Sequence, residues 1–319
     1  MAVVDVETTN GHMVVDEVRE EIARFVSADQ SADMGMGWHR DLPDFRDYTP
    51  DHEAIKLLLK KTGAVQGLKT PAALPAAVDL RQWFSPVENQ GQLGSCTANA
   101  GVGLVEYFER RAAGRHIDAS RLFLYKATRD LLGWHGDTGA TLRSTMEALA
   151  TFGVPPEQYW PYQIAQFDVE PTAFCYAFAQ DFKAIQYYRL DPPGTTPQVL
   201  LARIKANAAA GLPSCFGFTV YSSVQQATAT GKIPFPTHGE QVVGGHAIDI
   251  AGYDDTLQIH NTNPGGPTTT GAFLIRNSWG TAWGQAGYGW LPYDYVLQHL
   301  AADFWTLIKE DWVDTGQFA

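Results

Sequence analysis

Cys96 stands between a glycine-rich turn and an amphipathic run, within the stretch PVENQGQLGSCTANAGVGLVEYFER. The apolar residues after it recur at helical spacing, which places the thiol in the first turn of a helix that begins near Ser95. The positive end of a helix dipole favours a thiolate, so this position suits a nucleophile. Such a nucleophile still needs a base, because a free thiol is only slightly ionised at neutral pH.

Two later stretches contain residues that could complete this chemistry. His246 opens the apolar strand GGHAIDIAGYD after two glycines that remove bulk beside it. It suits a base, with a hydrogen-bonded core histidine as the alternative. Asn277 ends an apolar strand and precedes Trp279 and Trp283. Its side-chain oxygen could accept a hydrogen bond from an imidazole N–H, with a turn asparagine beside core tryptophans as the alternative.

Taken together and in order, QGQLGSC, GGHAIDIAGYDD and RNSWGTAWGQAGYG resemble the Gln, Cys, His and Asn boxes of the papain-like cysteine peptidases. The resemblance covers residues 78–295. It implies that Cys96 is the nucleophile, that His246 is the general base and acid, and that Asn277 orients the imidazole. It also implies that Gln90 and the backbone N–H of Cys96 donate hydrogen bonds to the oxyanion.

The same resemblance implies residues that contact a bound peptide. Trp279 would shield the hydrogen bond between the histidine and the asparagine, with Trp283 beside it. The segment GDTGA lies where the family has a glycine pair that hydrogen-bonds the substrate backbone. Gly139 is therefore the candidate for that β-type contact, with Thr138 in place of the first glycine. Gly245 precedes the histidine where plant enzymes often have an aspartate, so the site lacks that charge.

Several residues depart from the family pattern. Leu93 replaces the cysteine that usually lies three residues before the nucleophile, so that signature disulfide is absent. Thr97 replaces the aromatic residue that usually follows the nucleophile. Bacterial members of the family resemble this pattern more closely than plant or lysosomal members do. Cys175 and Cys215 lie in apolar surroundings and are expected to be small, unreactive core residues.

Composition and charge exclude several classes of function. The chain has 319 residues, with 23 Lys and Arg against 35 Asp and Glu, and a net charge of -12. No segment has a basic stripe, so we expect a peptide or protein substrate and no nucleic acid partner. No apolar run reaches the ~20 residues of a membrane span, and the acidic N-terminus lacks secretory features, which predicts a cytoplasmic protein. The cysteine spacing predicts no metal site, and we expect no cofactor.

The pattern along the chain predicts a catalytic domain over 75–319 with an α+β, papain-like two-lobed fold. A helical lobe over about 79–180 and a β-barrel-like lobe over about 181–310 would enclose the active-site cleft. Helices are predicted from near Ser95 and over 118–131, 141–152 and 196–211. Strands are predicted in FKAIQYYRL, SCFGFTVY, GGHAIDIAGYD and GAFLIRNSW, and the polar stretch DDTLQIHNTNPGGPTTTG is predicted to be a loop that overhangs the cleft.

Residues 1–74 form a predicted N-terminal extension. It contains an amphipathic helix over 14–27 and a short helix in DHEAIKLLLKK with Asp51 as its N-cap. Between them lies an irregular segment, for which the predicted anchors are Trp38, Phe45 and Tyr48. We expect the extension to pack on the catalytic domain and to cover part of the cleft, as the prosegment of a zymogen does. A permanent structural cap and a docking arm for another protein are the alternatives.

The leading hypothesis from sequence is a thiol peptidase that works through an acyl-enzyme, with endopeptidase action favoured because no His-His occluding loop is evident. An acyl or amide transferase would use the same thioester and differ only in the nucleophile that reaches it. A non-catalytic binding module on the peptidase fold is disfavoured because all four catalytic positions are filled. The physiological substrate, the activation trigger and the oligomeric state stay open at this level.

Overall fold

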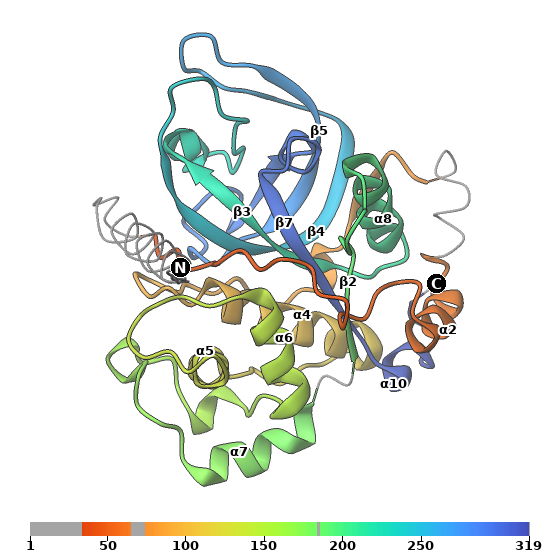
Figure 1. The fold of residues 1–319 in the computed structure, drawn as a ribbon, viewed down its shortest axis with the longest axis vertical. Coiled ribbons are helices and arrows are strands. Elements are labelled where there is room, and N and C mark those ends of the chain that lie inside the picture. Colours follow the sequence, from red (N-terminus) through yellow and green to blue (C-terminus); the bar gives the residue numbers. More distant parts are fainter. Residues whose placement is uncertain (1–33, 65–73, 184–185, 319) are drawn as a thin grey trace, which may run out of the picture.

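A helical lobe and a β-rich lobe meet along helix α4, which lies beneath the sheet in Figure 1. The computed structural model describes residues 34–64, 74–183 and 186–318. The α-helices are α2 (Glu53–Lys61), α4 (Cys96–Ala113), α5 (Arg121–Leu132), α6 (Leu142–Thr151), α7 (Ala173–Ala179), α8 (Pro197–Ala209), α9 (Asp294–Leu297) and α10 (Glu310–Val313). No helix in these ranges has the length and apolarity needed to cross a membrane.

One antiparallel sheet forms most of the β-rich lobe. Its strands are β1 (Ala77–Asp79), β2 (Gln186–Arg189), β3 (Ser214–Tyr221), β4 (Val242–His260), β5 (Thr268–Arg276), β6 (Tyr288–Pro292) and β7 (Ala301–Ile308). The strand order is β2-β7-β3-β4-β5-β6, with β1 paired to β4. The predicted α+β, two-lobed fold is confirmed, but the sheet is open rather than closed into a barrel, because β2 and β6 do not pair.

Local sequence signals account for the starts of the helices that support the site. Ser120 and Thr141 accept hydrogen bonds from backbone N–H groups in the first turns of α5 and α6. The helix predicted over 118–131 therefore begins at Arg121, after its serine cap. Asp51 was predicted to cap α2, but His52 occupies the N-cap and makes no side-chain cap bond.

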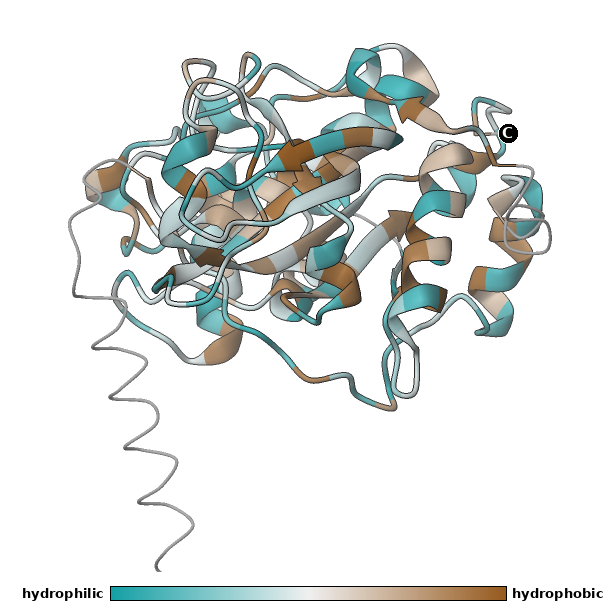
Figure 2. Ribbon diagram, turned by 90° about the horizontal axis from the view of Figure 1, so that it is seen from above, coloured by the Kyte–Doolittle hydropathy of each residue, from teal (hydrophilic) through white to brown (hydrophobic). Residues whose placement is uncertain are grey.

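Small residues allow α4 to approach its neighbours closely. A Cβ added at Gly101 would lie 2.9 Å from Thr145 of α6 and 3.2 Å from Leu124 of α5. A Cβ added at Gly103 would meet the side chains of Asp249 on β4 and Arg276 on β5. The helix that begins with Cys96 is thus packed against both lobes. In Figure 2, hydrophobic residues are frequent in the central strands, and hydrophobic and hydrophilic residues alternate along the helices.

The strand predictions were incomplete, since β1, β6 and β7 were not predicted. All eight residues of β7 are buried and so lack the alternation of a half-exposed strand. The polar stretch predicted as an overhanging loop instead extends the β4–β5 hairpin, with His260 opposite Thr268 and Gln258 opposite Thr270. Its threonines suit a strand with little burial, so polarity alone was misleading. The helix predicted over 14–27 lies outside the described residues.

We predict that Leu124→Ala destabilises the protein by about 2–5 kcal/mol, because it leaves a cavity between α5 and α4. Leu124 is fully buried. Leu131→Ala on the same helix is the matched control, since Leu131 is 39% exposed. It should change the free energy of unfolding by less than about 1 kcal/mol. Urea unfolding of both variants measures the difference, and equal losses would contradict the packing described for α5.

Candidate active site

Cys96 is the first residue of α4 and has no exposed surface. The preceding turn carries Gly91 with a φ of 62°, a left-handed conformation that suits glycine. The backbone N–H groups of Ala247 on β4 and Gly37 in the N-terminal extension lie against the sulfur. The thiol therefore lies where the helical lobe, the β-rich lobe and the extension meet.

His246 and Asn277 are brought together by adjacent strands. His246 lies in β4, and Asn277 directly follows β5, which pairs with β4. The imidazole Nε2 lies 2.8 Å from the side-chain oxygen of Asn277. Because that oxygen can only accept, Nε2 carries the proton and Nδ1 is the unprotonated nitrogen. Nδ1 is buried and has no hydrogen-bond partner among the described residues, so it is free to act as a base.

Trp279 covers the imidazole. Its ring stacks on His246 with a centroid distance of 4.5 Å and an interplanar angle of 18°. Trp283 meets Trp279 edge to face at 5.5 Å and supports it from behind. All three side chains are buried, as is Asn277. The two tryptophans thus keep water from the hydrogen bond that fixes the imidazole.

Gln90 presents a side-chain N–H toward the site. Its Oε1 accepts a hydrogen bond of 2.5 Å from the hydroxyl of Ser278, which orients the amide. Nε2 then donates to the carbonyl oxygens of Leu93, at 2.8 Å, and Gly35, at 3.0 Å. Gly35 belongs to the extension, and its oxygen also accepts the indole N–H of Trp279 at 3.2 Å. Of the two donors predicted for an oxyanion, the Gln90 side chain therefore holds a peptide carbonyl oxygen in this structure.

The extension crosses the site as a strand-like segment, drawn in orange between the lobes in Figure 1. Its backbone is held from both sides by the bonds Gly35 N to Gly91 O (2.9 Å), Gly37 N and Trp38 N to Gly245 O (both 3.1 Å), Ala140 N to Gly37 O (2.8 Å) and His39 N to Ala140 O (3.0 Å). Residues 35–39 of the extension therefore lie against Gly91, Ala140 and Gly245 and against the side chain of Gln90. Trp38 is a true anchor at 8% exposed, whereas Phe45 and Tyr48 are 92% and 42% exposed and are not.

The wall predicted at Thr138 and Gly139 lies beside this segment. The carbonyl oxygen of Thr138 lies 2.5 Å from Nε2 of His39. Gly139 has a φ of 72°, and a Cβ there would collide with the carbonyl of Gly37. The reciprocal backbone pairing is made one residue later, by Ala140. Glycine at position 139 is what allows the two backbones to come so close.

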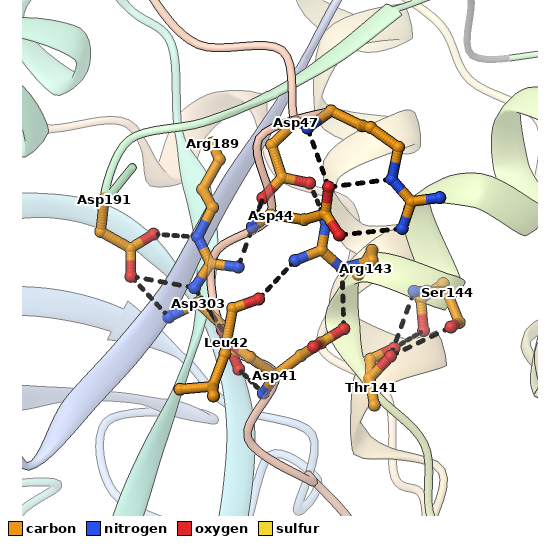
Figure 3. Close-up of polar contacts among 12 residues, drawn as sticks. Asp41, Leu42, Asp44, Asp47, Thr141, Arg143, Ser144, Arg189, Asp191 and Asp303 are labelled. Carbon is orange, nitrogen blue, oxygen red and sulfur yellow. Dashed lines mark hydrogen bonds and ion pairs between the residues drawn. The ribbon is translucent and has the colours of Figure 1, made fainter. Parts of the chain in front are cut away.

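Ion pairs fix the next part of the extension to both lobes (Figure 3). Arg143 of α6 pairs with Asp41 at 2.8 Å and with Asp47. Arg189 of β2 donates to the carbonyl of Asp41 at 3.2 Å and lies 3.8 Å from Asp47. The backbone N–H of Arg189 also bonds the carbonyl of Tyr48 at 2.8 Å. Acids of the extension thus meet one arginine from each lobe.

Burial determines the protonation of the two reactive groups. It raises the pKa of the Cys96 thiol to about 12, although nearby backbone N–H groups favour the thiolate. It lowers the pKa of His246 to about 4, although the hydrogen bond to Asn277 opposes this shift. Both groups are therefore neutral at pH 7 in this covered state, because burial disfavours the charged form of each.

Sequence reasoning missed several residues at the site. Ser278 directly follows Asn277, and its role in holding Gln90 depends on a contact across 188 positions. Asp303 accepts the indole N–H of Trp38 at 3.1 Å from a strand that was not predicted. Residues 35–37 act through backbone atoms, which every residue has. No pattern in the sequence marks these contacts. Ser278 lies inside the asparagine box, but its contact with Gln90 is not signalled there. Among the described residues, no cluster of His, Cys, Asp and Glu could hold a metal ion.

Comparison with known proteins places this geometry in a wider context. A protein-family model described as papain family cysteine protease matches residues 74–298. An uncharacterized peptidase C1-like protein of Acanthamoeba polyphaga mimivirus is 33% identical over 286 residues, which cover 85% of this chain and 86% of that protein. Peptidase 1 of Psoroptes ovis is 28% identical over 254 residues, which cover 77% of this chain and 70% of that protein.

Solved structures give the same result. Xylellain, a cysteine protease from Xylella fastidiosa, superposes with a TM-score of 0.66 and 33% identity, over 86% of this chain and 95% of that chain. A cysteine protease from Carica candamarcensis in complex with E-64 superposes with a TM-score of 0.53 over 74% of this chain and 99% of that chain. At 24% identity, the second likeness supports the fold alone.

We predict that Trp38→Ala in the full chain raises the rate at which iodoacetamide labels Cys96 at pH 7 by at least about tenfold, because a solvated thiol regains a pKa nearer ~8.5. Peptide mapping by mass spectrometry measures the rate at each cysteine.

Phe45→Ala is the matched control, since it removes an exposed aromatic ring from the same segment. It should leave labelling of Cys96 unchanged, and Cys175 and Cys215 should stay unlabelled in every variant because both are buried. An unaltered rate at Cys96 in Trp38→Ala would show that this side chain does not hold the cover in place.

Proposed function

This chain belongs to the papain family of cysteine proteases, and from that premise we propose that it hydrolyses internal peptide bonds through an acyl-enzyme on Cys96. Cysteine-type peptidase activity follows from the family itself. The proposal adds the roles of individual residues and the state in which the chain is active.

One observation carries the proposal: the site already binds an extended peptide, supplied by residues 35–39. Backbone groups of Gly91, Ala140 and Gly245 hydrogen-bond that peptide, and Gln90 holds one of its carbonyl oxygens. Contacts to main-chain atoms do not depend on the side chains of the occupant. The same groups would therefore bind an extended segment of another protein once residues 35–39 move away.

In the proposed first step, Nδ1 of His246 takes the proton from the Cys96 thiol. The sulfur then attacks the substrate carbonyl carbon, and the carbonyl π electrons move to oxygen. Asn277 keeps the Nε2 proton in place, so that the imidazolium carries its new proton on Nδ1, the nitrogen that Asn277 leaves free. That proton passes to the leaving amine as the carbon–nitrogen bond breaks, which leaves a thioester on Cys96 and a neutral imidazole.

The developing oxyanion would be held by the Nε2–H of Gln90 and the backbone N–H of Cys96. The hydroxyl of Ser278 preorients that amide, so no reorganisation is needed when charge develops. In the second half of the reaction, His246 takes a proton from water as the water oxygen attacks the thioester. Collapse of the second tetrahedral species releases the carboxylic acid and returns the proton to the sulfur.

We also propose that the covered chain is latent. The backbone N–H of Gly37 in the extension lies against the sulfur. Residues 35–38 therefore fill the site and exclude a substrate from it. Their removal would rehydrate Cys96 and His246 and so restore the conditions for a thiolate and an imidazolium. Displacement and proteolytic removal of the extension would both have this effect.

We predict that full-length Trp38→Ala cleaves an unstructured protein such as casein faster than the unaltered chain does. Adding Cys96→Ala should abolish cleavage. Adding Gln90→Ala should lower kcat/KM by about 10²- to 10³-fold, because one oxyanion donor is lost. Urea midpoints equal to that of Trp38→Ala would show that the added variants are folded. Equal activity with and without the Trp38 side chain would contradict the proposed latency.

Analysis of the products tests the reaction itself. Hydrolysis gives new free carboxyl termini, whereas transfer of the acyl group to an added amine such as hydroxylamine gives a modified terminus. The proposal expects free carboxyl termini at internal positions of casein when no amine is added. Products limited to the ends of the chain would contradict endopeptidase action.

A further inference from the structure

The side chain of Trp38 occupies a pocket beside the catalytic groups. Its ring lies directly against Gly217 of β3, where any Cβ would collide with it, and its backbone lies against Gly245 of β4. The ring N–H points to the carboxylate of Asp303 on β7, with a distance of 3.1 Å to Oδ2. Asp303 is fully buried. The pocket is therefore lined by the bare backbone of two glycines and by a carboxylate that accepts the ring N–H.

Asp303 is presented by an irregularity of the sheet. Cys215 pairs with Trp305 and Gly217 pairs with Ala302, so two steps along β3 match three steps along β7. The extra residue forms a β-bulge, and Asp303 has a φ of 59°, in the left-handed region that a residue with a side chain rarely adopts. Bulges and such backbone conformations persist where the surrounding structure gains from aiming one side chain.

The two oxygens of Asp303 have different partners (Figure 3). Oδ1 accepts from Arg189 of β2 at 2.6 Å, and Arg189 is held in turn by Asp191 at 2.9 Å. These residues belong to the β-rich lobe and remain when the extension leaves. Oδ2 accepts from the Trp38 indole and from the backbone N–H of Asp41 at 2.8 Å. Both of these donors belong to the extension and leave with it.

A substrate that replaces the extension therefore inherits a buried carboxylate oxygen without its donors. Leaving a buried acceptor of this kind unpaired is costly, so the pocket discriminates against a side chain without a donor. Arg189 already neutralises much of the Asp303 charge, so a positively charged substrate side chain would gain less from binding there. The bare faces of Gly217 and Gly245 leave room for a wide, flat ring. Shape and hydrogen bonding thus favour the same kind of side chain.

Resting on the proposed function, we infer that Asp303 determines specificity and selects peptide substrates that place a tryptophan side chain in this pocket. Trp38 is the ligand that shows the fit. Tryptophan combines the flat ring with the single ring donor that Oδ2 requires, whereas phenylalanine and leucine have no donor.

The test uses full-length Trp38→Ala, which removes the indole from the pocket; a bound peptide then displaces the remaining extension, including the Asp41 N–H that Oδ2 accepts. Fluorogenic peptides carry Trp, 3-benzothienylalanine, Phe, Leu or Arg at each of three positions before the cleaved bond. Benzothienylalanine keeps the two-ring shape and replaces the N–H with sulfur. Burial raises the pKa of Asp303 to about 6, against the opposing effect of Arg189, so the assay is run at pH 7.5, where the carboxylate is ionised.

At one position, Trp is expected to exceed benzothienylalanine about 10- to 100-fold in kcat/KM, the range of a hydrogen bond to a charged group. Adding Asp303→Ala should remove this difference. Asp311→Ala, which removes an exposed acid, should preserve it. If Asp303→Ala does not fold, the comparison of the Trp and benzothienylalanine peptides on Trp38→Ala still tests the inference.

Three results would overturn the inference. Equal cleavage of the Trp and benzothienylalanine peptides would reject the inference about Asp303, and so would a tenfold preference for Arg over Trp. In either case, cleavage of the Phe and Leu peptides would still support the proposed peptidase function. Absence of cleavage of every peptide, with Cys96 readily labelled, would reject the proposed function and this inference together.

Discussion

Exclusion of water from Cys96 and His246 is the constraint on which the rest of this structure depends. Both side chains are fully buried, and burial disfavours the charged form of each. The contacts that bury the proposed catalytic pair therefore also keep both groups neutral. Backbone atoms of residues 35–38 provide that cover without introducing a charge into the site. A cover made of charged side chains would instead have stabilised one of the ions that it must suppress.

Assembly of the pair requires that three elements keep their relative positions. Cys96 begins α4, His246 lies in β4, and Asn277 follows β5, so a shift of any of them separates the groups. A buried polar cluster behind the site ties these elements. Arg276 of β5 lies 3.8 Å from Asp249 of β4 and bonds Ser85 at 3.1 Å. Glu106 of α4 accepts the N–H of Ala119 at 2.9 Å, and burial raises its pKa to about 7. Removing one member would leave a buried charge unpaired, which is costly.

The extension does more than fill space between the lobes. Its acids pair with Arg143 of the helical lobe and approach Arg189 of the β-rich lobe. Its tryptophan inserts beside β3 and bonds Asp303 of β7. These contacts join residues that lie 96 to 265 positions apart, so the segment links parts of the fold that are distant in the sequence. The same set of contacts covers the site and holds the two lobes together.

The sequence by itself determined the local features of this protein. The helix starts near Ser120 and Thr141, the amphipathic run after Cys96, the apolar strand that His246 opens and the one that Asn277 ends are short-range signals, because helix and strand periodicity depends on neighbouring residues. The boxes around these residues identified the family for the same reason. Only the tertiary structure decided that the site is covered, that β7 is a strand and that Asp303 faces Trp38. Those features depend on backbone hydrogen bonds, complete burial and a bulge in pairing, and each is made by residues far apart in the chain. Main-chain atoms are common to every residue, so the sequence contains no pattern that predicts where they meet.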